Sequence, residues 1–298
     1  MAKPQSASGY EEVRTLACER VLVTLLRGLG PWKLSLFLVG GLTPRYLVNA
    51  RPPEVPAHSG TLDIDVVVDL QILASVEAYR SLEDNLKRLG FERAKNRDGK
   101  PVNWRWSTRL DTGPVVLELL ADRPENEAGK VQAMPTERRI SALNIPYASM
   151  VLDSFSEKRV TAALIGENGI ATETIRFADI VAFICLKALA FDDRNERKDA
   201  YDLVYCLRHF EGGPERVAEL FLNRIAENKH IQPINKALSI LADRFATGRG
   251  VEGYQKDGPV AVAKFEPDDN QVDRGTRIRR QRDASGAVEI FLDRLRRK

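Results

Sequence analysis

Two aspartates stand two residues apart inside an apolar run of the sequence, Asp63 and Asp65 in LDIDVVVD. Side chains two apart on a β-strand project from the same face, so both carboxylates lie together while Ile64 and Val66 point the other way. At about 3.3 Å per residue, the two aspartate Cα atoms are about 6.6 Å apart. Two like charges on one face of an apolar strand favour a compensating cation, and Mg²⁺ prefers such oxygen ligands. The spacing therefore predicts a divalent-metal site.

A glycine pair ends the apolar run that comes before this strand in the sequence. Without Cβ atoms, Gly40 and Gly41 let the backbone turn sharply and let a ligand approach the amides. Pro44 suits the first turn of a short helix that carries Arg45, and N–H groups at a helix start attract phosphate. We therefore expect Gly40, Gly41, Thr43 and Arg45 to surround the phosphates of a nucleotide.

The order of strand, Gly-Gly, short helix, loop and Asp-x-Asp strand resembles the signature of the polymerase-β-like nucleotidyltransferase superfamily. A second block, LKALAFDDRNERKDAYDL at residues 186–203, resembles the Lys-x-x-Ala and Lys-Asp-x-Tyr-Asp-Leu segment of the AbiEii family of type IV toxin nucleotidyltransferases. The resemblance implies an α+β fold, in which a polymerase-β-like nucleotidyltransferase domain with a mixed sheet precedes a helical C-terminal domain.

Glu118 is the single acid in another apolar run, VVLELL. The resemblance implies that Glu118 joins Asp63 and Asp65 as the third metal ligand, supplied by a neighbouring strand. Aspartate is the commoner residue at this place in the family. The alternative is that Glu118 forms an ion pair across the sheet with an arginine such as Arg105 or Arg109.

Lys187 interrupts the nearly all-apolar helical segment FICLKALAF, so it must either extend to solvent or meet negative charge. The resemblance implies that Lys187 contacts the nucleotide triphosphate and that Asp199 completes the site. Asp202 lies about one helical turn after Asp199, where it could orient Lys187. The alternative is an interhelical ion pair between Lys187 and Asp202 without a catalytic role. Arg194 either binds phosphate or is a plain loop residue.

Other residues able to bind a ligand give weaker signals. His58 lies in a loop with three prolines beside the expected metal site, and a lone loop histidine is expected to be a solvent-exposed bystander. Trp104 and Trp106 share one face of an expected strand, where packing in the sheet is favoured over stacking on a base.

The composition is that of an ordinary soluble protein of two domains. The chain has 298 residues, 43% hydrophobic and 29% charged, which is enough for a substantial core. It contains no run of about 18 apolar residues typical of a membrane span, and its start does not resemble a signal peptide. Three widely spaced cysteines suit reduced thiols. We therefore expect a cytoplasmic protein that does not enter membranes.

Hydrophobic periodicity predicts strands first and helices later. Ser8 and Glu11 match a capping box for a first helix that ends near Arg27. Besides the strand of Asp63, the expected strands are residues 34–39, 91–95, 102–108, 115–120, 159–164 and 170–175, and the later helices are 75–89, 179–190, 198–210, 214–228, 234–245 and 287–295. The expected domains are a nucleotidyltransferase domain (1–176), a helical domain (177–247), and a flexible arm with a basic terminal helix (248–298).

The C-terminal segment is strongly basic. From Arg274 onward, nine basic residues stand against three acidic ones, a formal balance of +6. Such a segment either meets a phosphate backbone or is the solvated face of an amphipathic helix.

The resemblance implies a nucleotidyltransferase that uses Mg²⁺ or Mn²⁺ to transfer a nucleoside monophosphate from a nucleoside triphosphate to an acceptor hydroxyl. It implies an RNA acceptor, such as the 3′ end of a tRNA, or a protein side chain, and the basic C-terminus favours RNA. It also implies a toxin role checked by a separate antitoxin protein. The alternatives are protein NMPylation, a small-molecule nucleotidyltransferase, and a nucleotide-binding module without turnover.

Overall fold

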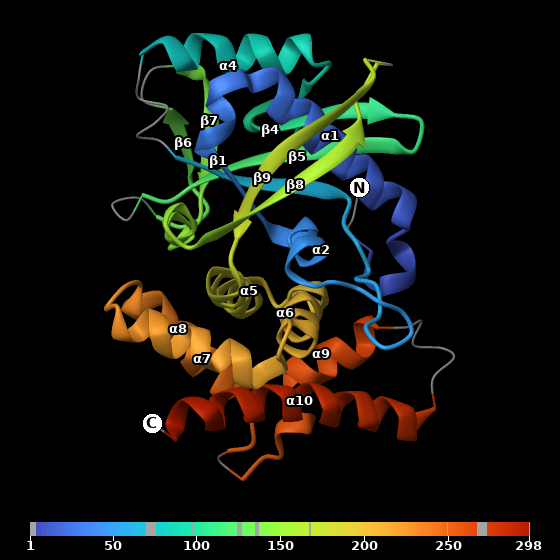
Figure 1. Cartoon of the computed structure of the whole chain (residues 1–298), viewed down its shortest axis with the longest axis vertical. Helices are drawn as coiled ribbons and strands as arrows, with labels where there is room; N and C mark the ends of the chain where they lie inside the picture. The colour runs from blue at the N-terminus through green and yellow to red at the C-terminus, as the bar shows by residue number, and fades with distance from the viewer. Residues whose placement is uncertain are drawn as a thin grey trace. The chain divides into compact units, whose positions relative to one another are not determined.

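The computed structural model describes residues 4–69, 76–96, 98–123, 127–134, 137–166, 168–248, 250–266 and 273–297. The protein has an α+β fold with a mixed β-sheet, and its chain forms two compact units (Figure 1). The sheet unit comprises Glu12–Thr43 and Gly60–Asp179. The helical unit comprises Met1–Glu11, Pro44–Ser59 and Ile180–Lys298. Each unit is described by itself below.

The sheet unit is built on strands in the order β3-β4-β5-β2-β1-β9-β8, with β7 beside β5 and β6 beside β7. Strands β1 and β2 are antiparallel, whereas β2 and β5 are parallel. The bounds are β1 Leu36–Val39, β2 Asp63–Val68, β3 Glu92–Lys95, β4 Pro101–Leu110, β5 Gly113–Ala121, β6 Val131–Met134, β7 Glu137–Asn144, β8 Phe155–Ala163 and β9 Ile170–Ala178.

One face of this sheet forms the core of the unit. Its side chains alternate along each strand with those of the other face, and the buried ones include Ile64, Val66, Trp106, Leu117 and Leu119. Helix α1 (Glu12–Leu29) contacts β9, β8 and β5, and α4 (Val76–Arg88) contacts α1 and β7 (Figure 1). The burial of Trp106 confirms packing in the sheet for that residue.

The helical unit contains α2 (Pro44–Leu47), α5 (Ile180–Arg194), α6 (Arg197–His209), α7 (Gly213–Ala226), α8 (Ile231–Arg244), α9 (Asp257–Phe265) and α10 (Arg274–Arg296). Helix α5 packs on α6 and α8, and α10 packs on α7 and α9. The core is rich in phenylalanine, with Phe191, Phe221, Phe245, Phe265 and Phe291 fully buried. The helices expected over residues 179–245 are therefore confirmed.

The prediction of a flexible arm after residue 247 is wrong. Residues 257–265 and 274–296 form helices α9 and α10, and Val262, Phe265, Val288 and Phe291 are buried in the helical unit. The terminal helix is also longer than the expected 287–295. Asp273 caps its start, because its side chain accepts a hydrogen bond from the Thr276 N–H. Glycines between residues 248 and 258 suggested a loose segment, but the apolar residues beyond them supply the packing.

The domain boundaries also differ from expectation. The expected change at residue 176 lies close to the observed one between Asp179 and Ile180, but residues 44–59 belong to the helical unit and not to the sheet unit. Sequence patterns give no sign of this, because the segment consists of one helical turn and a proline-containing loop.

Smaller differences concern the expected elements. Strands β6 and β7 were not expected, and the helix α1 begins at Glu12, after a separate 3-10 turn at Ala7–Gly9 that contains Ser8. The prediction of a capping box formed by Ser8 and Glu11 is therefore wrong. The expected start of the helix at Ser75 lies outside the described residues. Among the helices that the structure describes, none combines the length and the apolar character that a membrane crossing needs.

Candidate metal site and a buried ion-pair cluster

The sheet unit brings three carboxylates together. Strand β2 carries Asp63 and Asp65, and β5 runs parallel beside it with Glu118 directly opposite Asp65. One carboxylate oxygen from each residue lies within 4.8 Å of the other two. Oxygens bound to one Mg²⁺ are about 3 to 4 Å apart, because each lies about 2.1 Å from the ion. Small side-chain rotations would therefore let Asp63, Asp65 and Glu118 hold a divalent cation.

These carboxylates occupy the half-exposed face of the sheet, opposite its core. On β5, Val115, Leu117 and Leu119 are buried, whereas Val116 and Glu118 between them are only partly buried. The same alternation on β2 leaves Asp63 and Asp65 partly exposed. Period-two alternation therefore places all three carboxylates on one face, opposite that of Ile64 and Leu117.

Gly40 lies directly against Asp65. Its φ of 72° is in the left-handed region, which glycine adopts without strain. A Cβ atom added to Gly40 would lie 2.0 Å from Asp65 Oδ2, so any other residue would displace the carboxylate. The sharp turn expected at the glycine pair is confirmed, and Gly40 shapes the space that Asp65 occupies. Gly41 is buried in the same 3-10 turn, Gly40–Leu42.

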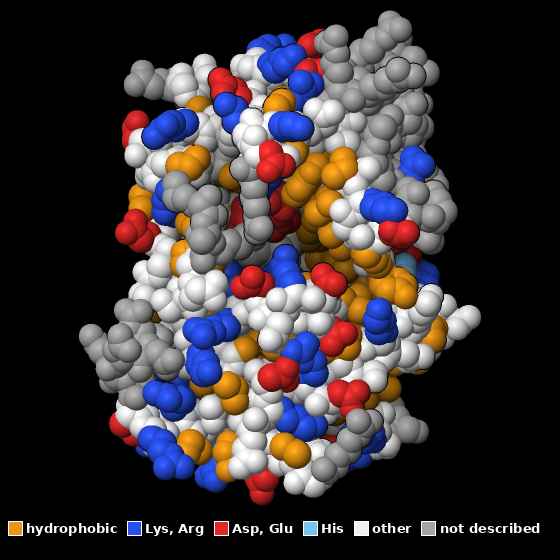
Figure 2. All heavy atoms as spheres, turned by 180° about the vertical axis from the view of Figure 1, so that it is seen from behind, with side chains coloured by type: hydrophobic (Ala, Val, Ile, Leu, Met, Phe, Trp, Pro, Cys, Tyr) orange, Lys and Arg blue, Asp and Glu red, His pale blue; other side chains and the backbone are white. Residues whose placement is uncertain are grey.

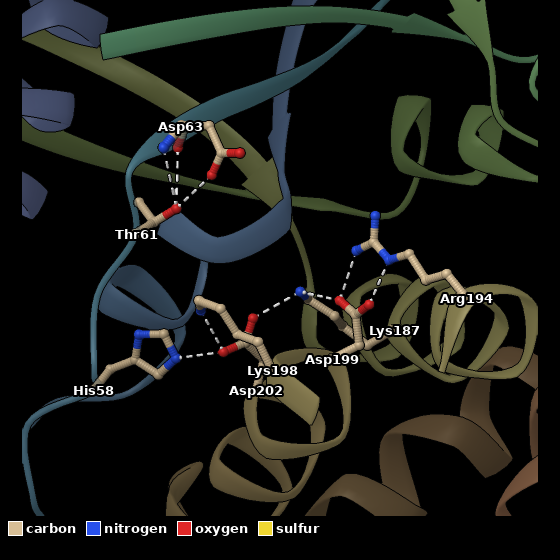
Figure 3. Close-up of polar contacts among 8 residues, drawn as sticks. All are labelled: His58, Thr61, Asp63, Lys187, Arg194, Lys198, Asp199 and Asp202. Atoms are coloured by element: carbon tan, nitrogen blue, oxygen red, sulfur yellow. Dashed lines mark hydrogen bonds and ion pairs between the residues drawn. The ribbon is translucent and has the colours of Figure 1, made fainter. Parts of the chain in front are cut away.

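Thr61 supports Asp63 from just before β2. Its side chain is buried, and its Oγ1 lies 3.0 Å from Asp63 Oδ1 (Figure 3). The Thr61 backbone N–H donates to Thr15 Oγ1 at 3.1 Å, which ties this position to helix α1. Sequence reasoning did not identify Thr61 because a threonine two residues before an aspartate is not distinctive.

Glu118 also has a basic neighbour. Arg105 on β4 is its antiparallel register partner, and Arg105 Nε lies 3.0 Å from Glu118 Oε1. The buried Nε has no aligned hydrogen-bond acceptor in the described structure, so the contact is an ion pair and not a hydrogen bond. The two expectations for Glu118 thus both hold in geometry: it lies in the triad and it pairs with Arg105.

Two of the expected phosphate residues, Thr43 and Arg45, belong to different units. Thr43 is the last residue of the Glu12–Thr43 segment of the sheet unit, and it is fully buried. Arg45 belongs to the helical unit. Helix α2 has only four residues, so its dipole is small. A helix of this length offers little dipole to a phosphate, and phosphate binding by Thr43 and Arg45 stays a prediction.

The helical unit contains a second group of charged residues, which we call the Lys187 cluster: His58, Lys187, Arg194, Lys198, Asp199 and Asp202 (Figure 3). Lys187 Nζ on α5 donates to Asp199 Oδ1 at 2.9 Å and to Asp202 Oδ2 at 2.7 Å, both on α6. The interhelical ion pair between Lys187 and Asp202 is therefore present. An ammonium has three N–H groups, and these two carboxylates use two of them.

Two more cations complete the cluster. Arg194 binds Asp199 with two hydrogen bonds, from Nε to Oδ2 at 2.6 Å and from Nη2 to Oδ1 at 2.8 Å. Lys198 Nζ donates to Asp202 Oδ1 at 2.7 Å. Arg194 is not a plain loop residue, because it is the last residue of α5 and binds a carboxylate. Asp202 orients Lys187, as expected from its place one turn after Asp199.

The carboxylates of the cluster are ionised despite their burial. Burial alone would raise the pKa of Asp199, but Lys187 and Arg194 lower it to about 2. Burial likewise opposes the charge on Asp202, yet Lys187, Lys198 and His58 hold its pKa well below the usual value. For Lys187, burial would lower the pKa, and the two carboxylates raise it above the usual value instead. Burial lowers the pKa of Lys198. With this lysine protonated, three cations and two anions give the cluster a formal excess of one positive charge.

His58 is not the exposed bystander that the sequence suggested. Its side chain is 6% exposed, and Nε2 lies 2.8 Å from Asp202 Oδ1. Its ring contacts the rings of Tyr201 and Tyr205, at centroid distances of 5.6 and 4.9 Å. Burial and the nearby Lys198 lower the pKa of His58 to about 4, so the ring is neutral at pH 7. Tyr205 Oη also donates to Pro56 O at 2.8 Å, which fixes the same loop on α6.

Comparison with models of known protein families finds no match to this chain, and comparison with curated proteins finds none either. The resemblance to the nucleotidyltransferases therefore rests on the sequence motifs alone.

The surface outside these sites carries both signs of charge. Basic and acidic side chains are interspersed over the face that Figure 2 shows, in keeping with a formal net charge of only +3. Attraction for a polyanion must therefore come from local groups of basic residues. The first three turns of α10 are such a group, with Arg274, Arg279 and Arg282 exposed.

Proposed function

We propose that the protein is a metal-dependent nucleotidyltransferase of the polymerase-β-like type, similar to the AbiEii family. The observation that carries the proposal is the convergence of Asp63, Asp65 and Glu118, with oxygens within 4.8 Å, beside the Gly40 turn.

In this proposal Asp63, Asp65 and Glu118 hold Mg²⁺ or Mn²⁺. The cation, when bound, neutralises charge on the triphosphate and orients its reacting phosphorus. The donor set fits, because hard cations of this kind take carboxylate oxygens and keep water in their other positions. Thr61 holds the Asp63 carboxylate through the contact of 3.0 Å, and Gly40 leaves the space that the Asp65 carboxylate needs.

The reaction is the transfer of a nucleoside monophosphate. An acceptor hydroxyl oxygen forms a bond to the α-phosphorus, the bond from that phosphorus to the bridging oxygen of pyrophosphate breaks, and pyrophosphate leaves with the bonding electrons. The hydroxyl proton passes to a carboxylate oxygen of the triad. Positioning and charge compensation carry most of the catalysis in transfers of this kind.

We include the Lys187 cluster in the proposal as a phosphate-binding element of the helical unit. Lys187 keeps one N–H beyond those given to Asp199 and Asp202, and the cluster has one positive charge in excess. The Asp199 and Asp202 carboxylates hold the ammonium in place, so that it meets a phosphate oxygen without reorganisation.

The acceptor that we propose is RNA, such as the 3′ end of a tRNA, supported by the exposed arginines of α10. The proposed role as a toxin with a separate antitoxin is supported by the resemblance to the AbiEii family alone. The proposed cytoplasmic location is supported by three cysteines that are free and buried, Cys18, Cys185 and Cys206.

The test is incubation of the full chain with Mg²⁺ and each labelled nucleoside triphosphate in turn, together with total tRNA or cell extract. Label on RNA is the expected result. Label on protein would instead support NMPylation, and tight nucleotide binding without any transfer would support a binding module.

The matched variants for this assay are Asp65→Asn and Asp111→Asn. Asp65→Asn removes one charge from the triad with almost no change in shape, and we expect transfer to fall at least 100-fold. Asp111 lies exposed in the turn between β4 and β5, so its variant should transfer normally. Transfer by Asp65→Asn at the wild-type rate would overturn the site assignment.

A further inference from the structure

Three charged side chains form a row across adjacent strands of the sheet. Asp65 on β2 is the register partner of Glu118 on β5, and Glu118 is in turn the register partner of Arg105 on β4. Directly opposed residues of neighbouring strands project from the same face. Arg105 therefore lies at the edge of the carboxylate triad, beside Glu118.

The guanidinium of Arg105 has hydrogen-bond donors to spare. An arginine that serves only to neutralise a carboxylate usually binds it with two parallel hydrogen bonds. Arg105 instead meets Glu118 through Nε alone, without hydrogen-bond alignment. The Arg105 side chain is 36% exposed, against 15% for Glu118, so its outer N–H groups reach solvent. The guanidinium also lies over the Trp104 ring, 5.9 Å from its centroid, and the contact with Glu118 does not fix the direction of its outer N–H groups.

Resting on the proposed function, we infer that Arg105 is a phosphate-binding residue of the site, and that it pairs with Glu118 only until a cation takes its place. A divalent cation on the triad satisfies the charge of Glu118 and repels the guanidinium. The guanidinium of Arg105 then turns to the oxygens of the phosphate bound by the cation. Its planar set of N–H donors matches the geometry of a phosphate group.

This role predicts opposite effects on two binding steps. In the absence of phosphate, Arg105 competes with the cation for Glu118, so Arg105→Ala should bind Mn²⁺ more tightly than the wild type. With Mn²⁺ bound, the same variant lacks a charged hydrogen-bond donor, so its affinity for inorganic tripolyphosphate should fall about 10-fold or more. A purely structural ion pair would not give the second effect, because Arg105 would then not contact the phosphate.

The experiment is calorimetric titration of the full chain, first with Mn²⁺ alone and then with tripolyphosphate at saturating Mn²⁺. Tripolyphosphate is the probe because it does not depend on which base the protein accepts. Arg109→Ala is the matched control: Arg109 lies on the same strand and the same face, is exposed, and pairs in register with Pro114. We expect the control to match the wild type in both titrations.

Arg105→Lys keeps the positive charge but lacks the planar guanidinium group. This variant also serves as the test if Arg105→Ala does not fold. We expect Arg105→Lys to bind Mn²⁺ as the wild type does and to bind tripolyphosphate several-fold more weakly. Wild-type affinity for tripolyphosphate in the Arg105 variants would overturn the inference while leaving the metal site intact. A wild type that binds no Mn²⁺ would instead overturn the proposed function, and the inference with it.

Discussion

Gly40 and Asp65 are in such close contact that a side chain at residue 40 would not fit. A Cβ there would lie 2.0 Å from Asp65 Oδ2 and 2.8 Å from Asp65 Cγ, so the whole carboxylate would have to move. Gly40→Ala should therefore lower Mn²⁺ affinity at least 10-fold, the range seen when a support of a metal ligand is removed. Calorimetric titration with Mn²⁺ measures this loss.

Gly99→Ala is the control for backbone strain. Gly99 has a similar φ of 77° in the turn before β4, but an added Cβ would meet nothing within 4 Å. Both variants should lose about 1–2 kcal/mol of unfolding free energy from the left-handed conformation. Only Gly40→Ala should lose metal affinity. Equal Mn²⁺ affinities in the two variants would show that the contact with Asp65 has no bearing on the metal.

Lys187→Met should destabilise the helical unit by about 3–5 kcal/mol. The substitution leaves Asp199 and Asp202 buried with too little compensation, and breaking one partner of a buried ion pair has effects of this size. The side chains of these carboxylates are 2% and 0% exposed. Urea denaturation followed by circular dichroism measures the change. Lys229→Met, at a lysine with a 53% exposed side chain, should change stability by less than about 0.5 kcal/mol.

His58 should make stability fall as the pH is lowered from 6.5 towards 4. Its pKa is about 4 in the folded protein against 6.5 for the ordinary group, so in this window the unfolded chain binds a proton that the folded chain does not. The contribution of the neutral His58 to the unfolding free energy is fully present above pH 6.5. At pH 4.5 the unfolding free energy should be about 2–3 kcal/mol lower. The neighbouring Asp202, with its lowered pKa, loses its contribution only below about pH 3.8.

His58→Gln separates these effects. A glutamine amide can still donate a hydrogen bond to Asp202, but it does not titrate. Urea denaturation at pH 7 and pH 4.5 should therefore show a smaller difference for His58→Gln than for the wild type. An unchanged difference would mean that His58 is not buried as a neutral ring.

The exposed arginines at the start of α10 should bind single-stranded RNA through its backbone. Replacing Arg274, Arg279 and Arg282 together by glutamine should weaken RNA binding and lower the slope of log affinity against log salt by about 2, because each phosphate contact contributes about 0.7. Fluorescence anisotropy at several salt concentrations measures both. A triple variant of Arg20, Arg88 and Arg109, which are exposed in the sheet unit, removes the same charge and should bind RNA normally. Equal losses in both variants would assign the attraction to net charge alone.

Local patterns in the sequence were enough to predict most elements and the side of the sheet that carries the acids. Period-two alternation around Asp63 and Asp65 places the two carboxylates on one face, and the strand of Glu118 is equally regular. The helices between residues 180 and 244 follow from apolar periodicity. The arm after residue 247 was misjudged, because its packing depends on helices α6 and α7, which are distant in the sequence.

The sequence by itself determined which residues can carry chemistry and on which face of their own element they stand, because helix and strand periods fix side-chain direction locally. Only the tertiary structure decided which of them meet. Register placed Glu118 opposite both Asp65 and Arg105, and the folding of a loop onto α6 buried His58 against Asp202. Such contacts depend on how distant segments pack, and no local period of the sequence encodes that packing.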